Sequence, residues 1–200
     1  MAKTNPGRFF EDYCNWQRIE PFSRFIHQSP AAALAGQLMG ARQVQIFHEH
    51  ILVKEPGTAK ATPWHQDGEY WPIRPLATCT VWIAADDSTP ENGCLRVIRG
   101  SHKRKSLYKH NQNDGPGLAL NQELDRAEYD EKDAVDIVLK AGQVSLHDVY
   151  LIHGSEPNKS PKPRRGMTLR FMPTTSVFDR DAADRMTREK KLGANHANRT

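Results

Sequence analysis

Hydrophobic and polar positions divide the chain into a helical beginning and a strand-rich remainder. Residues 1–41 are predicted to be helical, because Ser29-Pro30 is typical of a helix start, residues 31–39 are small and apolar, and Gly40 is a typical stop. After Gly40, short apolar runs with many β-branched residues predict strands. The predicted strands are 44–47, 51–53, 77–84, 94–98, 135–139, 144–146, 150–152 and 167–172.

Turn signals rich in Gly and Pro separate these strands, at 55–57, 90–93, 113–117 and 141–142. A parallel sheet would need a helix-length segment between successive strands, and the region lacks such segments. The pattern therefore predicts a mainly β fold, an antiparallel sandwich or barrel over residues 42–174, with flanking N-terminal helices.

Two polar segments interrupt or follow this core. Residues 103–133 are charged and poor in β-branched residues, which predicts a long loop excursion with a short helix near 121–129. Long excursions in compact domains often border an active site. Residues 179–200 are charged and almost free of large apolar side chains, which predicts a solvated helix and tail. The whole chain, 1–200, is expected to form a single domain.

Composition narrows the function classes. The 28 Lys and Arg residues against 24 Asp and Glu give a net charge of +4, with both signs interspersed, so we expect no nucleic acid partner. Three unpaired cysteines favour a reducing, cytoplasmic location. The apolar runs are too short to span a bilayer, so we expect no membrane partner. The sequence leaves the oligomeric state open.

A histidine and a carboxylate two residues apart, His65 and Asp67, are the first candidate for chemistry. In extended backbone, such residues face the same side, roughly 6 to 7 Å apart, and can converge on one metal ion. Two imidazoles and one carboxylate are the ligand set of non-haem Fe(II) oxygenases. Without a further ligand, a surface hydrogen-bonded pair would be the better explanation of these two residues.

The candidate for the further ligand is His153, which follows the predicted strand 150–152 in a segment suited to burial. A lone histidine there would be a satisfied core residue, whereas a third ligand on a late strand would close a metal site. Arg164 lies eleven residues later, at the start of a predicted strand. Its guanidinium suits bidentate binding of a carboxylate, although a solvated arginine is the commoner outcome.

Three motifs in order are similar to those of the phytanoyl-CoA dioxygenase (PhyH) family. They are Thr62-Pro63-Trp64-His65-Gln66-Asp67, the region from Trp82 to His102 with Glu91-Asn92-Gly93-Cys94, and His153-Gly154-Ser155 with Asn158 and Arg164. The resemblance covers roughly residues 43–172. It implies a double-stranded β-helix, a cupin-like jelly roll, that holds Fe(II) through His65, Asp67 and His153.

The resemblance also implies a cosubstrate site. Arg164 and Ser155 would bind the distal carboxylate of 2-oxoglutarate, and Trp82 would line its pocket. Trp71 is a candidate for the pocket wall, although packing explains it equally well. Lys54 matches the family pattern without an assigned role, and His102, in a structural turn, is expected to be a non-ligand. His48 and His50 are expected to be exposed histidines on a strand.

The implied activity is that of a dioxygenase that uses Fe(II), 2-oxoglutarate and O₂ to oxidise a small-molecule substrate with release of succinate and CO₂. Halogenases similar to this family replace the carboxylate ligand, so Asp67 favours hydroxylation, with desaturation or ring closure as other outcomes. The alternatives are a nucleic-acid demethylase, a non-catalytic metal-binding jelly roll, and a truncated, inactive family member, since typical members have a longer N-terminal helical region.

Overall fold

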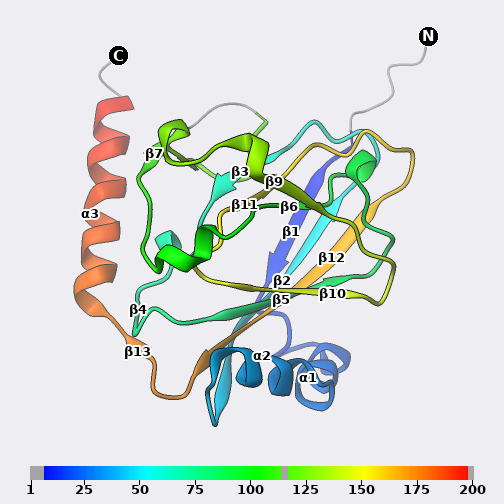
Figure 1. Ribbon diagram of the computed structural model, residues 1–200, viewed down its shortest axis with the longest axis horizontal. Coiled ribbons are helices and arrows are strands. Elements are labelled where there is room, and N and C mark those ends of the chain that lie inside the picture. The colour runs from blue at the N-terminus through cyan, green and yellow to red at the C-terminus, as the bar shows by residue number, and fades with distance from the viewer. Residues whose placement is uncertain (1–6, 114–116, 198–200) are drawn as a thin grey trace.

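The computed structural model describes residues 7–113 and 117–197, and for 189–197 it describes the backbone only. The predicted turn at 113–117 therefore lies partly outside the described residues. Two antiparallel sheets face each other as the walls of a jelly roll (Figure 1). This arrangement confirms the prediction of a mainly β, jelly-roll fold with N-terminal helices.

The N-terminal segment is not entirely helical. Strand β1 (Phe9–Tyr13) precedes helices α1 (Glu20–Gln28) and α2 (Ala31–Met39). The prediction of a helical segment over 1–41 is thus wrong for β1, which forms because its backbone pairs with a later strand. Helix α2 has the predicted bounds, and Gly40 ends it in the left-handed conformation, with φ of 63°.

The larger sheet has the order β1-β2-β12-β5-β10. Its other strands are β2 (Val44–Lys54), β12 (Arg164–Pro173), β5 (Cys79–Ala84) and β10 (Val144–Asp148). Strand β2 runs without a break through the two short strands predicted at 44–47 and 51–53, because β1 and β12 pair with it on either side.

The smaller sheet has the order β3-β11-β6-β9 and contributes two of the candidate ligands. Its strands are β3 (Thr62–His65), β11 (His153–Ser155), β6 (Leu95–Ile98) and β9 (Ala134–Ile137). The strand predicted at 150–152 is displaced in the structure, since β11 begins at His153 and residues before it form a turn.

Side chains of the larger sheet alternate between two environments. Leu169 and Phe171 of β12 face outward and pack with Ile26, Ala31 and Ala35 of the two helices, which cover that face (Figure 1). Residues of the opposite parity on β12, among them Arg164 and Arg170, face the interior of the jelly roll. The fold therefore directs charged side chains of one strand inward.

The excursion at 103–133 contains short elements in place of the helix predicted near 121–129. They are the 3₁₀ turns η3 (Ser101–Arg104), η4 (Arg126–Glu128) and η5 (Glu131–Asp133), with the hairpin of β7 (His110–Gln112) and β8 (Gln122–Leu124). The helix is absent because β8 pairs with β7, a partner that a local pattern does not reveal. Two further 3₁₀ turns are η1 (Asp67–Tyr70) and η2 (Pro90–Asn92).

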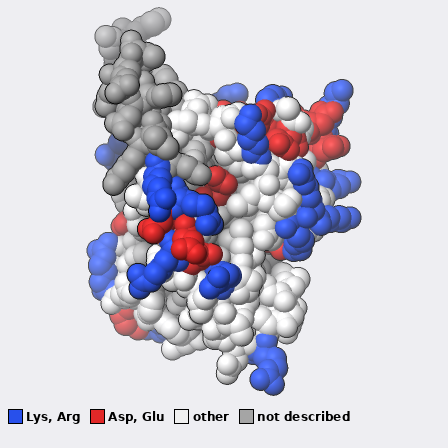
Figure 2. All heavy atoms as spheres, turned by 90° about the vertical axis from the view of Figure 1, so that its left-hand side faces the viewer, with Lys and Arg blue, Asp and Glu red and all other residues white. Residues whose placement is uncertain are grey.

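The C-terminal region leaves the core through a small two-stranded sheet of β4 (Ile73–Arg74) and β13 (Val177–Phe178). Helix α3 (Arg180–Ala197) follows and runs along the left side of the molecule in Figure 1. On the face seen in Figure 2, Lys and Arg side chains lie among Asp and Glu side chains. Within the described part of the chain, every helix is too short or too polar to cross a bilayer.

Candidate metal centre and cosubstrate pocket

His65 and His153 lie opposite each other on adjacent strands of the smaller sheet. They are register partners of β3 and β11, and their ring centroids are 4.2 Å apart. Each ring places Nδ1 within hydrogen-bond distance of a backbone carbonyl, at 2.8 Å for Pro63 O and 2.9 Å for Leu151 O. Since a carbonyl only accepts, each Nδ1 carries the proton and each Nε2 is left with a lone pair for a metal ion.

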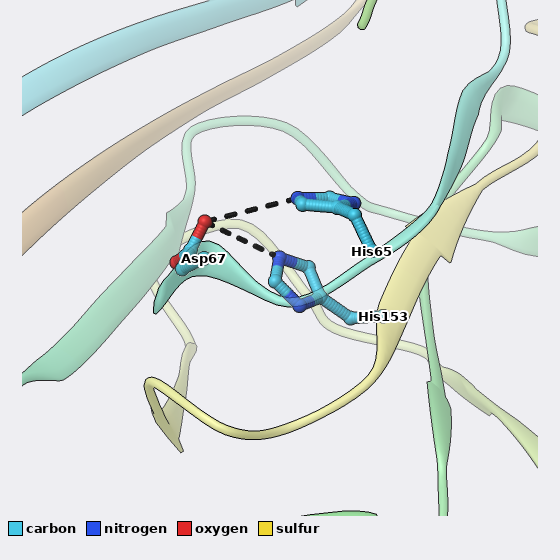
Figure 3. A group of neighbouring side chains, drawn as sticks. All are labelled: His65, Asp67 and His153. Carbon is cyan, nitrogen blue, oxygen red and sulfur yellow. Dashed lines mark ion pairs between the residues drawn. The ribbon is translucent and has the colours of Figure 1, made fainter. Parts of the chain in front are cut away.

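Asp67 completes the group from the start of η1, directly after β3. Its Oδ1 lies 3.7 Å from His65 Nε2 and 3.8 Å from His153 Nε2, so the three side chains point toward one position (Figure 3). All three residues are buried, and one ligand atom from each lies within 4.8 Å of the others. The structure thus brings together the three predicted ligands on one side of a potential ion, which fits the two-histidine, one-carboxylate arrangement of non-haem Fe(II).

The other oxygen of Asp67, Oδ2, faces polar groups that the sequence analysis did not identify. The Thr80 hydroxyl donates to it at 3.2 Å, the Arg170 Nε lies at 3.6 Å, and the His147 Nε2 lies at 3.9 Å. Burial alone would raise the pKa of Asp67, but the charge of the Arg170 guanidinium outweighs it and holds that pKa well below its usual range. Asp67 is therefore an ionised carboxylate, ready to bind a cation.

The His153 imidazole beside it is suited to metal binding for a related reason. Burial, together with the neighbouring His65, holds the pKa of His153 well below its usual value, so the ring is neutral near pH 7. Burial also lowers the pKa of His147 to about 4. Among the described residues, both ring nitrogens of His147 lack a hydrogen-bond partner. His147 lies outside the three-residue group but next to its carboxylate.

A cavity of about 520 Å³ adjoins the triad, within the size range of small-molecule sites. Arg164 and Trp82 line it, with the guanidinium 5.5 Å from the centre of the indole ring. Burial lowers the pKa of Arg164 to about 10, which still leaves it charged near neutral pH. Its Nε has no hydrogen-bond partner among the described residues. The guanidinium is thus available to an anion in the cavity.

Gly166 explains how the Trp82 indole fits beside this strand. A Cβ at position 166 would lie 2.6 Å from Trp82 Cζ2, which is closer than carbon atoms can approach. Ser155 also lines the cavity, and its hydroxyl accepts a hydrogen bond of 2.7 Å from Lys54 Nζ. Lys54 is fully buried and further donates to the backbone carbonyls of Ser155 and Glu156.

The structure also places the neighbouring histidines and the tryptophan that the sequence analysis singled out. His48 and His50 are half-buried and line the cavity, so the expectation of exposed strand histidines is wrong. Trp71 both lines the cavity and packs with Ile73 and Val149. His102 lies in η3, outside the three-residue group found among the described residues.

Arg170 is the main residue that the sequence analysis missed. The sequence did contain a signal for it. Arg170 lies six positions after Arg164, and residues an even number of positions apart on one strand face the same side. His147 and Thr80 gave no such signal, because only the pairing of β5 with β10 and β12 brings them beside Asp67.

Comparison with known proteins agrees with the motifs. The family model for phytanoyl-CoA dioxygenase (PhyH) matches residues 5–166. A phytanoyl-CoA dioxygenase of Arabidopsis thaliana is 33% identical over 74% of this chain and 51% of its own length. A methylphosphonate hydroxylase of Gimesia maris is 34% identical over 74% of this chain and 52% of its own length. The chain thus spans about half the length of these curated relatives.

Among solved structures, EvdO2 from Micromonospora carbonacea var. aurantiaca complexed with 2-oxoglutarate has a similar fold. The TM-score is 0.72 at 24% identity, over 85% of this chain and 69% of that one. The family model covers most of the chain, and the motifs that carry the resemblance coincide with the buried triad. The chain belongs to the phytanoyl-CoA dioxygenase family.

Proposed function

We propose that the chain is an Fe(II)- and 2-oxoglutarate-dependent dioxygenase that hydroxylates a C–H bond of a small organic substrate and releases succinate and CO₂. The observation that carries this proposal is the convergence of His65, Asp67 and His153 on one position beside a cavity with Arg164 in its wall. A metal ion with three protein ligands keeps open positions for a chelating cosubstrate and for O₂. When bound, iron with 2-oxoglutarate would supply the oxidising power for the reaction.

Each residue around the metal position would have a defined task. His65, Asp67 and His153 would hold the iron, and the hydrogen bonds from both Nδ1 atoms fix the imidazoles in the required tautomer. Thr80 would hold the Asp67 carboxylate in place through Oδ2. This hydrogen bond would restrict the Asp67 carboxylate to one orientation.

For the cosubstrate, we propose Arg164 as the residue that binds the distal carboxylate of 2-oxoglutarate, with Trp82 as the wall beside it. Its buried, unpaired Nε supports this assignment, because a buried cation needs an anionic partner. Ser155 would be a second polar contact for the same carboxylate. Lys54 donates a hydrogen bond to the Ser155 hydroxyl and so holds that hydroxyl in position.

The apolar and aromatic part of the cavity supports the exclusion of water from the reacting atoms. Leu52, Tyr70 and Leu95 line it together with Trp71 and Trp82. Leu120 extends the wall from the excursion at 103–133. This lining would protect a strong oxidant from quenching and would direct it to the bound substrate.

The proposal is tested by incubation of the purified chain with Fe(II), ascorbate and 2-oxoglutarate under air, with quantification of succinate. We expect succinate above the level of the His65→Ala variant, and we expect a bound substrate to increase it. A wild-type chain that binds metal and 2-oxoglutarate and yet forms no succinate with any substrate would support the alternative, a non-catalytic metal-binding module or an inactive family member. Mass spectrometry of the product separates hydroxylation, which adds one oxygen atom, from desaturation or ring closure.

A further inference from the structure

A second buried guanidinium, that of Arg170, lies in the cavity and has no task in the reaction proposed above. It is six positions after Arg164 on β12, roughly 20 Å along an extended strand. Arg164 lies beside Trp82, whereas Arg170 is the register partner of Thr80, the residue that donates to Asp67. Strand β12 therefore carries two guanidinium groups at separate positions. That of Arg164 is suited to 2-oxoglutarate, and that of Arg170 lies beside the carboxylate of Asp67.

The contacts of Arg170 hold it in place and leave part of its donor capacity unused. One terminal nitrogen donates to Thr168 Oγ1 at 2.7 Å and lies 3.3 Å from His48 Nε2. Since a guanidinium only donates, His48 Nε2 accepts and the proton of that ring is on Nδ1. The guanidinium carbon lies 5.2 Å from the centre of the Trp71 ring. Nε has no hydrogen-bond partner within the described part of the chain.

The charges around the cavity do not balance once the metal is bound. Two arginines, Arg164 and Arg170, and two acidic residues, Glu11 and Asp67, line the described wall. Glu11 is partly exposed and lies 3.3 Å from His50 Nε2 at the edge strand, which leaves Asp67 as the carboxylate near Arg170.

The charge of a divalent ion would cancel the negative charge of Asp67 and leave one net positive charge. Dianionic 2-oxoglutarate would offset that charge and the charge of Arg164. The charge of Arg170 would then remain, in a buried place where an unpaired cation is costly. A loaded site of this composition needs one more anion.

On the basis of the proposed function, we propose that the primary substrate is an organic acid whose oxyanion, a carboxylate or a phosphonate, binds Arg170 between His48 and Trp71. The fork of donors on a guanidinium matches such a group in bidentate fashion. The remainder of the substrate lies against the apolar wall, which includes Leu52, Leu95 and Leu120. Arg170 is thus a substrate-binding residue that sets the distance between the anionic group and the oxidised carbon.

The arrangement has a thermodynamic consequence that a purely structural arginine would not produce. In the metal-free protein Asp67 already neutralises Arg170, so an added acid finds a cation that is partly engaged. Binding of a divalent metal at Oδ1 offsets the charge of the carboxylate, so Asp67 no longer neutralises Arg170 and the guanidinium attracts an added anion more strongly. Metal and organic acid therefore bind with positive coupling, and this coupling requires Arg170.

The test uses the full chain loaded with Ni(II), which replaces Fe(II) without turnover, and with 2-oxoglutarate. A matched panel of alkyl and aryl carboxylic acids, their primary amides and the corresponding phosphonic acids is titrated, with tryptophan fluorescence as the signal because Trp71 and Trp82 line the cavity. We expect the best acids to bind at least about tenfold more tightly than their amides. We expect this preference to weaken without metal. The carboxylic and phosphonic arms decide which oxyanion the site prefers.

Three variants complete the test. Arg170→Gln should remove the preference for acids while it retains Ni(II) and 2-oxoglutarate binding at neutral pH, and Arg170→Lys should keep part of the preference. The matched control is Arg165→Gln on the same strand, because Arg165 is exposed, pairs with Asp86 and should leave the preference unchanged.

Two results would overturn this inference and leave the proposed function intact. One is a wild-type chain that binds Ni(II) and 2-oxoglutarate but binds acids and amides equally. The other is an Arg170→Gln variant that keeps the full preference, which would reduce Arg170 to a residue that orients Asp67. A wild-type chain that binds neither Ni(II) nor 2-oxoglutarate would instead overturn the proposed function, and the metal-dependent preference with it.

Discussion

The Arg170 guanidinium and the Asp67 carboxylate form a buried ion pair, with Nε and Oδ2 3.6 Å apart. The second oxygen of the same carboxylate, Oδ1, faces the Nε2 atoms of His65 and His153. One carboxylate therefore serves a permanent cation on one side and the metal position on the other. In the absence of metal, the fold depends on this carboxylate to compensate Arg170.

Replacement of Asp67 by asparagine should therefore destabilise the metal-free protein. The variant leaves a buried guanidinium without its anion, which costs about 3 kcal/mol of unfolding free energy. The matched control is Asp86→Asn, which removes the carboxylate that pairs with Arg165, an exposed arginine on the same strand as Arg170, and should cost less because solvent compensates the charge of Arg165. Urea unfolding in the presence of EDTA measures both. Equal losses for the two variants would contradict the role assigned to the buried pair.

The two histidine ligands should be required for metal binding and dispensable for folding. His65→Ala and His153→Ala should weaken Ni(II) or Fe(II) affinity more than about 100-fold, because replacement of groups that merely support a ligand already costs 10- to 100-fold. Both variants should also lose succinate formation. His102→Ala should retain wild-type affinity, since His102 lies in η3 outside the group. Isothermal titration gives the affinities, and circular dichroism verifies the fold.

Arg164 should determine the affinity for 2-oxoglutarate. Arg164→Lys keeps a positive charge but loses the fork of donors, so we expect KM for 2-oxoglutarate to rise at least about tenfold with a smaller effect on metal affinity. Arg165→Gln is the neighbouring control and should leave KM near the wild-type value. An unchanged KM in Arg164→Lys would show that another residue binds the distal carboxylate.

Lys54 should make the stability of the fold depend on pH in the alkaline range. Burial, followed by the charge of Arg164, lowers its pKa from 10.5 to about 7. Between these two values the unfolded chain holds a proton that the folded chain lacks, so the free energy of unfolding rises with pH, by at most about 1.4 kcal/mol per pH unit. Urea midpoints from pH 7 to pH 10 measure the slope.

The Lys54→Met variant should lose this part of the slope. Lys140→Met, at an exposed position that pairs with Asp87, is the control and should keep the wild-type slope. If Lys54→Met and the wild type have parallel pH profiles, then Lys54 remains protonated in the fold throughout this range.

The sequence predicted those features that depend on local patterns. His65 and Asp67 are two residues apart, so extended backbone alone brings them to one side, and helix α2 has a small apolar run that ends at Gly40. The positions of His153 and Arg164 beside predicted strands, together with the motif resemblance, added two residues that are distant in sequence. All four line one cavity in the structure.

The features that the sequence did not reveal depend on pairing between distant strands. Strand β1 carries a pattern too short to distinguish from a helix, and its pairing with β2 decides its conformation. The pairing of β7 with β8 likewise replaces a predicted helix. Arg170 and Asp67 meet only after β12 has paired with β5, so no local spacing could indicate their contact. The half-buried state of His48 and His50 has the same origin.

Strand β12 carries both cavity guanidiniums on a single stretch of backbone that is paired on both sides. The distance between them is consequently as rigid as the sheet itself, and neither can move without disruption of the core. Adaptation to substrates of other sizes therefore falls to the opposite wall, where the surface excursion contributes Ala119 and Leu120. Changes in that loop would therefore alter which substrates bind, while β12 would keep the two guanidinium groups at fixed positions relative to the metal site.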